Sequence, residues 1–298
     1  MVNFSNLLAA TTNSASSYDS TINMMLNIWN IGFPIMMALL GGVLASAIFC
    51  LFSRQDFKAW AFGRSQCDSC KEVLKWYELI PALSYLLQKG CCRHCKAPIP
   101  YTFFIADLCG ISLGWAGGNV ALTLYASGMP VWGLVAFAAC LFFLLISAMS
   151  DLYDTMISTG IILLMFISSF VVSAAKGNIM YSGVLAVFCF AAYFVVYGIQ
   201  QITGKGVKSS GFPEVAGFGS ADLFLLVSLC NIFSPLHTGL ICMSAVLMFS
   251  LLNSTVRKLT YAEGPTHFPL FPFCCVGMFL PLAFNPYLSQ FSAILGWG

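Results

Sequence analysis

The sequence predicts an all-α protein that crosses a membrane several times and carries a small metal-binding module in one loop. Of the 298 residues, 59% are hydrophobic and only 8% are charged, whereas soluble domains average about 25% charged residues. The apolar residues form long runs, and four cysteines form two CxxC pairs in one polar loop. So little charge cannot cover a soluble surface, and the protein is therefore expected in lipid. A net charge of +2 gives no reason to expect a nucleic-acid partner.

Eight apolar stretches are long enough to cross a bilayer as helices, which takes roughly 20 residues. They are Met24–Phe52, Phe103–Tyr125, Val131–Ser150, Ile157–Ala175, Met180–Ile199, Val215–Phe233, Leu236–Leu252 and Phe268–Phe291. The sixth is the weakest of them, because Gly217, Gly219 and Asp222 lie in its first half.

The distribution of basic residues predicts how these spans are oriented, because Lys and Arg favour cytoplasmic loops. Eight of the thirteen Lys and Arg fall in the loop Ser53–Thr102, and alternate threading puts four more on that side, leaving only Lys176 opposite. We therefore expect an external tail at residues 1–23, a first transmembrane helix at 24–52 and a cytoplasmic zinc-binding loop at 53–102. Residues 103–298 would form a core of seven membrane helices.

The cytoplasmic loop contains two CxxC knuckles separated by twenty-one residues. Each knuckle offers two thiolates, and four thiolates complete the tetrahedral shell of a structural Zn²⁺. The predicted ligands are Cys67, Cys70, Cys92 and Cys95. Cys91 and His94 lie in the second knuckle as possible substitutes. Redox-active thiol pairs are the alternative, and a reducing cytosol disfavours disulfides.

Two aspartates lie at the ends of predicted spans, on the same side of the membrane. Asp151 follows the third span and Asp222 opens the sixth, 71 positions further along the chain. Acidic side chains near lipid are costly and usually functional. Two carboxyls held close together share one proton, so that the ionised one can activate water while the protonated one donates to a peptide carbonyl. This is the apparatus of an aspartyl protease.

The spacing of the acids leaves other interpretations open. A helix-end aspartate is often only a cap, Asp107 suits a polar contact between helices, and Asp154 is the alternative to Asp151. A transporter would carry its acids near the bilayer midplane, and a membrane thiol oxidoreductase would need its CxxC pairs on the oxidising side. An inactive assembly protein is a further alternative.

Further residues around the knuckles carry a family resemblance. Trp76, Ile80-Pro81 and Ser84 stand between the knuckles, Tyr101 and Asp107 follow them, and Pro269-Leu270-Phe271-Pro272-Phe273 lies in the last span. With these features the chain, from about Ser46 to Phe273, resembles the type IV prepilin peptidases, which are GxGD-type membrane aspartyl proteases.

The resemblance implies that Asp151 and Asp222 are the catalytic pair, and it also shows departures from the family pattern. Ser158 and Thr159 stand where the family has Pro-Asp after the first aspartate, and Ala221 and Phe224 replace the second Gly and the Lys around the second. Near the amino end, Phe49 replaces an Asn. The chain is thus similar to a divergent member whose two aspartates are retained.

The family's activity sets the functional expectation. Members in the bacterial inner membrane remove the basic leader from type IV pilin and pseudopilin precursors at the cytoplasmic face. Bacterial members also methylate the new amino terminus with S-adenosylmethionine. The resemblance implies both activities for this chain, with precursor proteins and membrane lipid as partners, and no sequence motif here indicates the methyl donor's site.

Overall fold

The computed structural model describes residues 4–54, 63–67, 69–154, 158–202, 220–233, 238, 240–245, 247 and 270–277. Within these residues all regular structure is helical, apart from two isolated β-bridges. The elements are α1 (Phe4–Arg54), η1 (Trp76–Glu78), α3 (Leu83–Leu87), α4 (Tyr101–Ala126), α5 (Val131–Asp154), α6 (Thr159–Ala175), α7 (Ile179–Ile202), α8 (Ser220–Ile232) and α10 (Leu270–Gly277). The predicted all-α class is confirmed for the described part of the chain.

Among the described residues, three helices are long and apolar enough to cross a membrane: Ile28–Arg54, Tyr101–Ala126 and Val131–Tyr153. Shorter apolar helical stretches occupy Thr159–Ala175, Ile179–Ala191 and Asp222–Ile232. The predicted spans Leu236–Leu252 and Phe268–Phe291 lie largely outside the described residues. The apolar helices indicate a membrane protein, and the count of eight spans stays a prediction.

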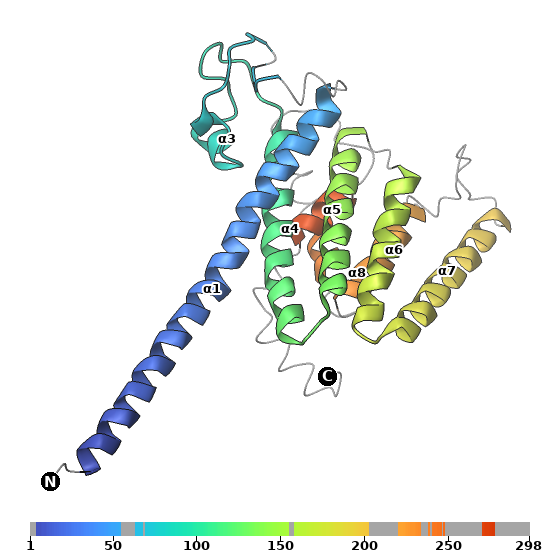
Figure 1. Ribbon diagram of the computed structural model, residues 1–298. Helices are drawn as coiled ribbons and strands as arrows, with labels where there is room; N and C mark the ends of the chain where they lie inside the picture. The colour runs from blue at the N-terminus through green and yellow to red at the C-terminus, as the bar shows by residue number, and fades with distance from the viewer. Residues whose placement is uncertain are drawn as a thin grey trace.

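The first helix is longer than the predicted span. It has 51 residues and extends through residues 4–23, the segment expected as an external tail. No Gly or Pro occurs in the described chain before Gly32, so nothing in this polar stretch strongly opposes a helix. Figure 1 shows the amino-terminal part of α1 projecting away from the other helices.

Two tight turns place successive helices side by side. Gly128 after α4 and Gly177 after α6 have φ of +78° and +76°, a conformation that suits glycine at a helix end. The residue after each glycine donates its amide to the carbonyl five residues earlier. Met129 donates to Leu124, and Asn178 donates to Ser173. Figure 1 shows both turns at the end of the bundle opposite the cysteine loop.

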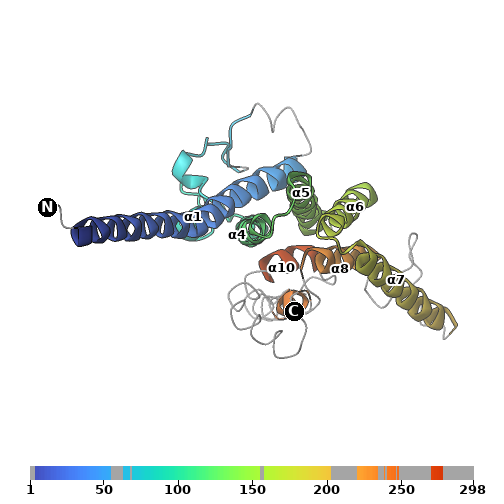
Figure 2. The same ribbon diagram turned by 60° about the horizontal axis from the view of Figure 1, so that its bottom comes forward.

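The helices form two layers, seen most clearly in Figure 2. One layer contains α1, α4, α5 and α6, and the other contains α10, α8 and α7. The buried core lies between them and includes Leu144, Met149, Leu225, Leu229 and Phe271. Because α10 packs against α4 and α5, the last described helix fills the centre of the fold.

The tightest helix contact joins α1 to α4 and depends on glycine. A Cβ added at Gly41 would lie 2.2 Å from the Gly110 carbonyl oxygen, and one added at Gly114 would lie 2.1 Å from that of Met37. Gly110, Gly114 and Gly118 repeat every four residues on α4, the small-residue pattern by which membrane helices approach closely.

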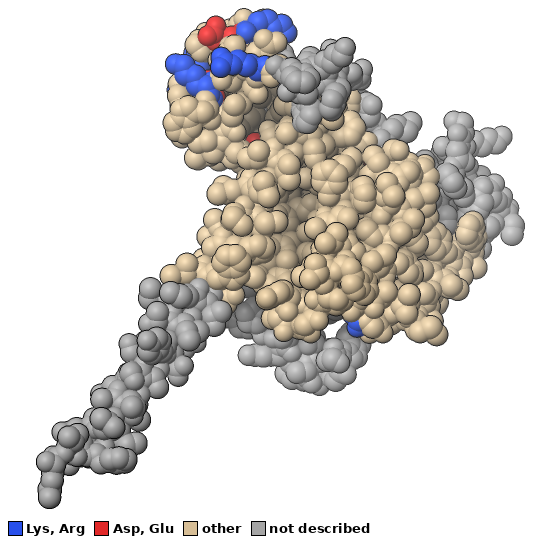
Figure 3. Space-filling model, viewed as in Figure 1, with Lys and Arg blue, Asp and Glu red and all other residues tan. Residues whose placement is uncertain are grey.

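Large apolar side chains cover the outside of the bundle. They include Leu39 and Val43 on α1, Val135 on α5, Leu164 on α6 and Val187 on α7. Figure 3 shows a helical body whose surface in this view is almost free of charge, while basic side chains gather on the cysteine loop. This distribution fits a bundle surrounded by lipid.

Candidate functional site

The two CxxC pairs stand on turns with the same backbone hydrogen bonds. The Lys71 amide donates to the Cys67 carbonyl at 2.9 Å, and the Lys96 amide donates to the Cys92 carbonyl at 3.0 Å. The amide of each first cysteine donates to the carbonyl five residues on, at 2.9 Å in both knuckles. Lys71 and Lys96 have φ of +58° and +60°, so each turn closes through a left-handed residue.

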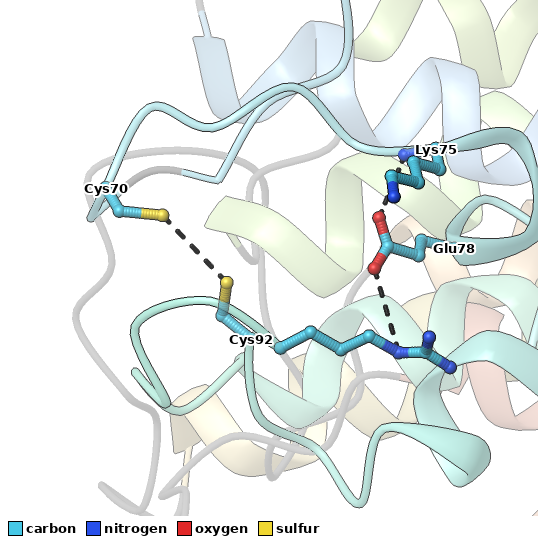
Figure 4. Close-up of polar contacts among 5 residues, drawn as sticks. Cys70, Lys75, Glu78 and Cys92 are labelled. Atoms are coloured by element: carbon cyan, nitrogen blue, oxygen red, sulfur yellow. Dashed lines mark hydrogen bonds and ion pairs between the residues drawn. The ribbon is translucent and has the colours of Figure 1, made fainter.

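These turns bring the four thiols together. All four Sγ atoms lie within 4.8 Å of one another. The Cys67 and Cys95 sulfurs are 3.9 Å apart, and those of Cys70 and Cys92 are 4.0 Å apart (Figure 4). Zinc–sulfur bonds of about 2.3 Å in a tetrahedron require sulfurs about 3.8 Å apart. The cluster therefore fits a tetrahedral metal ion, and it includes neither Cys91 nor His94.

The turn around the first knuckle also favours the thiolate form. The pKa of Cys67 is lowered to about 7, because the backbone amides of Cys70 and Ser69 donate hydrogen bonds to its sulfur. Thiolates, not thiols, bind metal. The pKa of Cys70 in the same knuckle is raised to about 12 by desolvation and by the neighbouring thiols, so Cys67 is the thiol of this knuckle that loses its proton more readily.

A buried glutamate ties η1 to the second knuckle. The Glu78 side chain is 2% exposed and lies 3.7 Å from Nε of Arg93, and the Lys75 amide donates to its second oxygen at 2.9 Å. Figure 4 shows these contacts beside the cysteines. The Arg93 guanidinium also lies 5.1 Å from the Tyr77 ring centroid. Arg93 of the second knuckle therefore contacts two residues of η1.

Asp107 fixes the module to the helices. Its Oδ2 accepts a hydrogen bond of 2.7 Å from the amide of Ala82, the residue before α3, and Ser46 of α1 interacts with the same carboxylate. The predicted contact between helices is present, since the carboxylate joins α4 to α1, and it also holds the loop. Ala82 has a φ of +58°, a conformation costly for alanine that this hydrogen bond helps to maintain.

The two candidate catalytic aspartates come from opposite layers of the bundle. Asp151 is buried near the end of α5, and Asp222 lies in the first turn of α8, where the helix dipole favours a carboxylate. The two carboxyl groups are close enough to interact electrostatically. Asp154 is the last residue of α5, and its side chain lies outside the described residues.

Helix α10 packs beside the two aspartates. The Phe271 amide, in its first turn, donates to Asp151 Oδ2 at 3.3 Å. Cys275 lies near Asp151, and Cys274 lies near Asp222. Helix α10 therefore lies near both carboxyl groups.

The far end of α8 is also held in place. Lys176, which follows α6, donates from Nζ to the carbonyls of Asn231 and Ile232, at 3.2 and 2.6 Å. A cation suits the carboxyl end of a helix, where carbonyls lack partners. This contact fixes α8 along its axis relative to α6, and with it the position of Asp222.

Sequence reasoning missed the residues that support these groups. The Phe271 amide carries no side-chain signal, although the Pro-rich segment around it was part of the family resemblance. Glu78 could have been suspected, because it is an acid between two knuckles rich in basic residues.

Comparison with known proteins gives the same family as the sequence motifs. The family model of the bacterial Peptidase A24 N-terminal domain matches residues 36–116, which hold the whole cysteine loop and parts of α1 and α4. Three similar proteins are called prepilin leader peptidase/N-methyltransferase. The Vibrio cholerae protein is 38% identical over 72 residues, that of Stutzerimonas stutzeri 25% over 238 residues, and that of Bacillus subtilis 28% over 187 residues.

These matches differ in how much they cover. The Vibrio match spans 21% of this chain and 28% of the relative, whereas the Stutzerimonas match spans 78% and 70%. The Bacillus match spans 62% and 71%. No solved structure matches the chain. The domain model and the long matches agree with the motifs, and over most of its length the chain is similar to proteins called prepilin leader peptidase/N-methyltransferase.

Proposed function

We propose that this protein is a membrane aspartyl endopeptidase that removes the basic leader from type IV pilin or pseudopilin precursors. The observation that carries the proposal is that Asp151 and Asp222, from helices far apart in sequence, lie within range of electrostatic interaction with each other. The family, whose members are named for prepilin cleavage, supplies the substrate class.

The reaction uses the carboxyl pair as one unit that holds a single proton. The ionised carboxylate takes a proton from water, and the resulting hydroxide attacks the scissile peptide carbonyl. The protonated carboxyl donates a hydrogen bond to the carbonyl oxygen and then helps to protonate the leaving amine. Two adjacent carboxylates cannot both ionise cheaply, which keeps the pair in this state.

The supporting contacts give each carboxyl a different environment. The Phe271 amide donates to one oxygen of Asp151 and so orients that carboxyl. Asp222 sits at a helix start, where the dipole favours the ionised form. Lys176 bonds to the other end of α8 and so fixes the position of Asp222 along the axis of that helix.

We assign Cys67, Cys70, Cys92 and Cys95 as ligands of one structural Zn²⁺. Four thiolates leave no coordination position for a substrate, so the metal would stabilise the loop without reacting. The role of these residues is to keep two knuckles, η1 and α3 in one module against α1 and α4. The metal would supply folding free energy that a loop this short lacks.

We infer a second activity, N-methylation of the new amino terminus with S-adenosylmethionine as donor. It rests on the family's name. The amine is released where cleavage occurs, so both reactions can share one membrane face.

The proposed topology follows the basic residues. Twelve of the thirteen Lys and Arg lie on the side of the zinc module when eight spans are threaded alternately, which predicts the cytoplasmic face of a bacterial inner membrane. A precursor's basic leader would stay on that face, beside Asp151 and Asp222.

Co-expression with candidate precursors tests this function. Mass spectrometry of the mature amino terminus should show loss of the leader and a mass increase of one methyl group. An intact leader on every pilin and pseudopilin tried, in cells where a known prepilin peptidase cleaves them, would refute the proposal.

A further inference from the structure

A row of large apolar side chains lies exposed along η1 and α3 of the zinc module. We call it the apolar stripe, and it consists of Trp76, Leu79, Leu83, Leu86 and Leu87. Trp76 is 78% exposed and Leu87 is 63% exposed. Positions 83, 86 and 87 share one face of α3, because residues three and four apart are neighbours on a helix. A water-facing loop rarely exposes so many large apolar side chains in one short segment.

The opposite face of α3 fixes this orientation. The Tyr85 ring stacks on Phe104 of α4, with the ring centroids 5.2 Å apart, and its hydroxyl donates to the Ile99 carbonyl at 3.5 Å. Because Tyr85 anchors α3 to α4, the helix cannot turn to bury the stripe within the module.

The stripe begins beside the interior of the membrane helices, not beyond the ends from which the zinc module extends. Ala82 is bonded to Asp107, which lies six residues into α4 from Tyr101, or about 9 Å at 1.5 Å per residue. Pro81 lies against Gly42 of α1, since a Cβ added at Gly42 would lie 3.0 Å from the Cβ of Pro81. Interfacial helices bury their apolar face about 5–10 Å into the boundary between headgroups and acyl chains.

The surface of α1 at this level is also apolar. Leu39, Leu40, Val43 and Leu44 flank Gly42 and are all exposed. Figure 1 shows α3 next to this part of α1, below the helix end at Arg54. The stripe therefore lies level with a helix surface that faces lipid if α1 spans the membrane.

Basic side chains complete the amphipathic character of the module. Lys71, Lys75, Lys89, Arg93 and Lys96 are all exposed. In Figure 3 the basic side chains gather with one acidic patch over the upper part of the module, and the surface below them towards the bundle is uncharged except for one small acidic spot. Cations above an apolar face are complementary to anionic headgroups above acyl chains.

We propose that the apolar stripe lies in the lipid leaflet on the zinc-module side, with the five cations contacting anionic headgroups. The module is thus a peripheral membrane anchor as well as a metal site. A second copy of the chain or a protein partner could also cover apolar side chains. The depth of Ala82 and Pro81 and the basic side chains above the stripe favour lipid.

Fluorescence quenching at Trp76 tests this proposal in the full-length chain, purified with zinc and placed one copy per lipid nanodisc. The difference between the wild type and Trp76→Phe isolates the Trp76 signal. We expect phosphatidylcholine brominated near the headgroup end of its acyl chains to remove most of that signal, and water-soluble acrylamide to remove little. Adding phosphatidylglycerol should increase the loss caused by brominated lipid.

A matched control places a tryptophan elsewhere on the same module. Glu72 is exposed in the first knuckle, so Glu72→Trp in the Trp76→Phe background should be quenched by acrylamide and not by brominated lipid. Strong acrylamide quenching of Trp76 would overturn the proposal. So would a signal quenched by neither agent, because the stripe would then be covered by protein. Equal lipid quenching with and without phosphatidylglycerol would overturn the role of the cations.

Discussion

At the scale of single residues, two lysines in left-handed conformations shape the metal site. Lys71 and Lys96 each occupy the fifth position of a knuckle, where φ is positive and the amide bonds back to the first cysteine. A side chain in this conformation costs about 1–2 kcal/mol that glycine would not. Ligation of a metal by the neighbouring thiolates can offset this cost.

Glycine at these positions should stabilise the module. Lys71→Gly and Lys96→Gly relieve the left-handed strain, so each should raise the free energy of unfolding by up to about 1 kcal/mol. The measurement is hydrogen exchange of residues 65–99 in the metal-loaded protein. Lys75→Gly is the control, because Lys75 has a φ of −81° and should only lose stability.

The thiol cluster predicts one bound zinc ion per chain. Cys67→Ser with Cys92→Ser removes a ligand from each knuckle and should abolish the metal and loosen the segment 65–98. Elemental analysis and limited proteolysis report these two effects. Cys91→Ser should keep its zinc, because Cys91 lies outside the cluster. Zinc retained in the double variant, or lost in the control, would show that the ligands are different.

At the scale of helices, the contact of α1 with α4 sets how the zinc module meets the membrane core. Gly110, Gly114 and Gly41 leave space for backbones to touch, and Asp107 and Ala82 then join the loop to this pair of helices. The same helices form much of the region that matches the family's amino-terminal domain.

A large side chain at Gly114 should disrupt this pair. Gly114→Leu would clash with the backbone of Met37, for which overpacking costs about 1–3 kcal/mol. The expected result is a lower melting temperature in detergent. Gly183→Leu is the control, since nothing lies within 4 Å of a Cβ at Gly183. Equal melting temperatures for the wild type and Gly114→Leu would refute the close approach.

Local patterns in the sequence predicted some of these elements and could not predict others. The CxxC spacing predicts the thiol cluster because each knuckle is a turn of a few residues. The glycine repeat on α4 could have predicted the close packing against α1, although that contact was not predicted. By contrast, the contact of Phe271 with Asp151 depends on where α10 packs, and no local pattern encodes that. The helical state of residues 4–23 was missed because polarity alone suggested a tail.

At the scale of the whole molecule, the fold brings two carboxyl groups that the sequence separates by 71 positions within range of electrostatic interaction. Asp151 comes from one layer of helices and Asp222 from the other, with α10 beside both. Helix-end positions alone could not establish that they meet, because the packing of α5, α8 and α10 determines it.

The proposed methyl transfer should be separable from cleavage. Asp151→Asn should fail to process a precursor yet still methylate a supplied mature pilin, because methyl transfer to an amine does not use the carboxyl pair. Mass spectrometry of the pilin with S-adenosylmethionine present measures this. Unmethylated termini from a wild-type protein that cleaves fully would contradict the second activity and leave the peptidase intact.

The comparison of three aspartate variants tests the central claim most directly. Asp151→Asn and Asp222→Asn should each abolish leader removal while the protein remains in the membrane, because either change destroys the shared-proton pair. Asp154→Asn should keep most of the activity. The measurement is the mature amino terminus of a co-expressed precursor, read by mass spectrometry. Full cleavage by Asp151→Asn or Asp222→Asn would contradict the account, and loss only in Asp154→Asn would show that a different carboxyl is the first catalytic group.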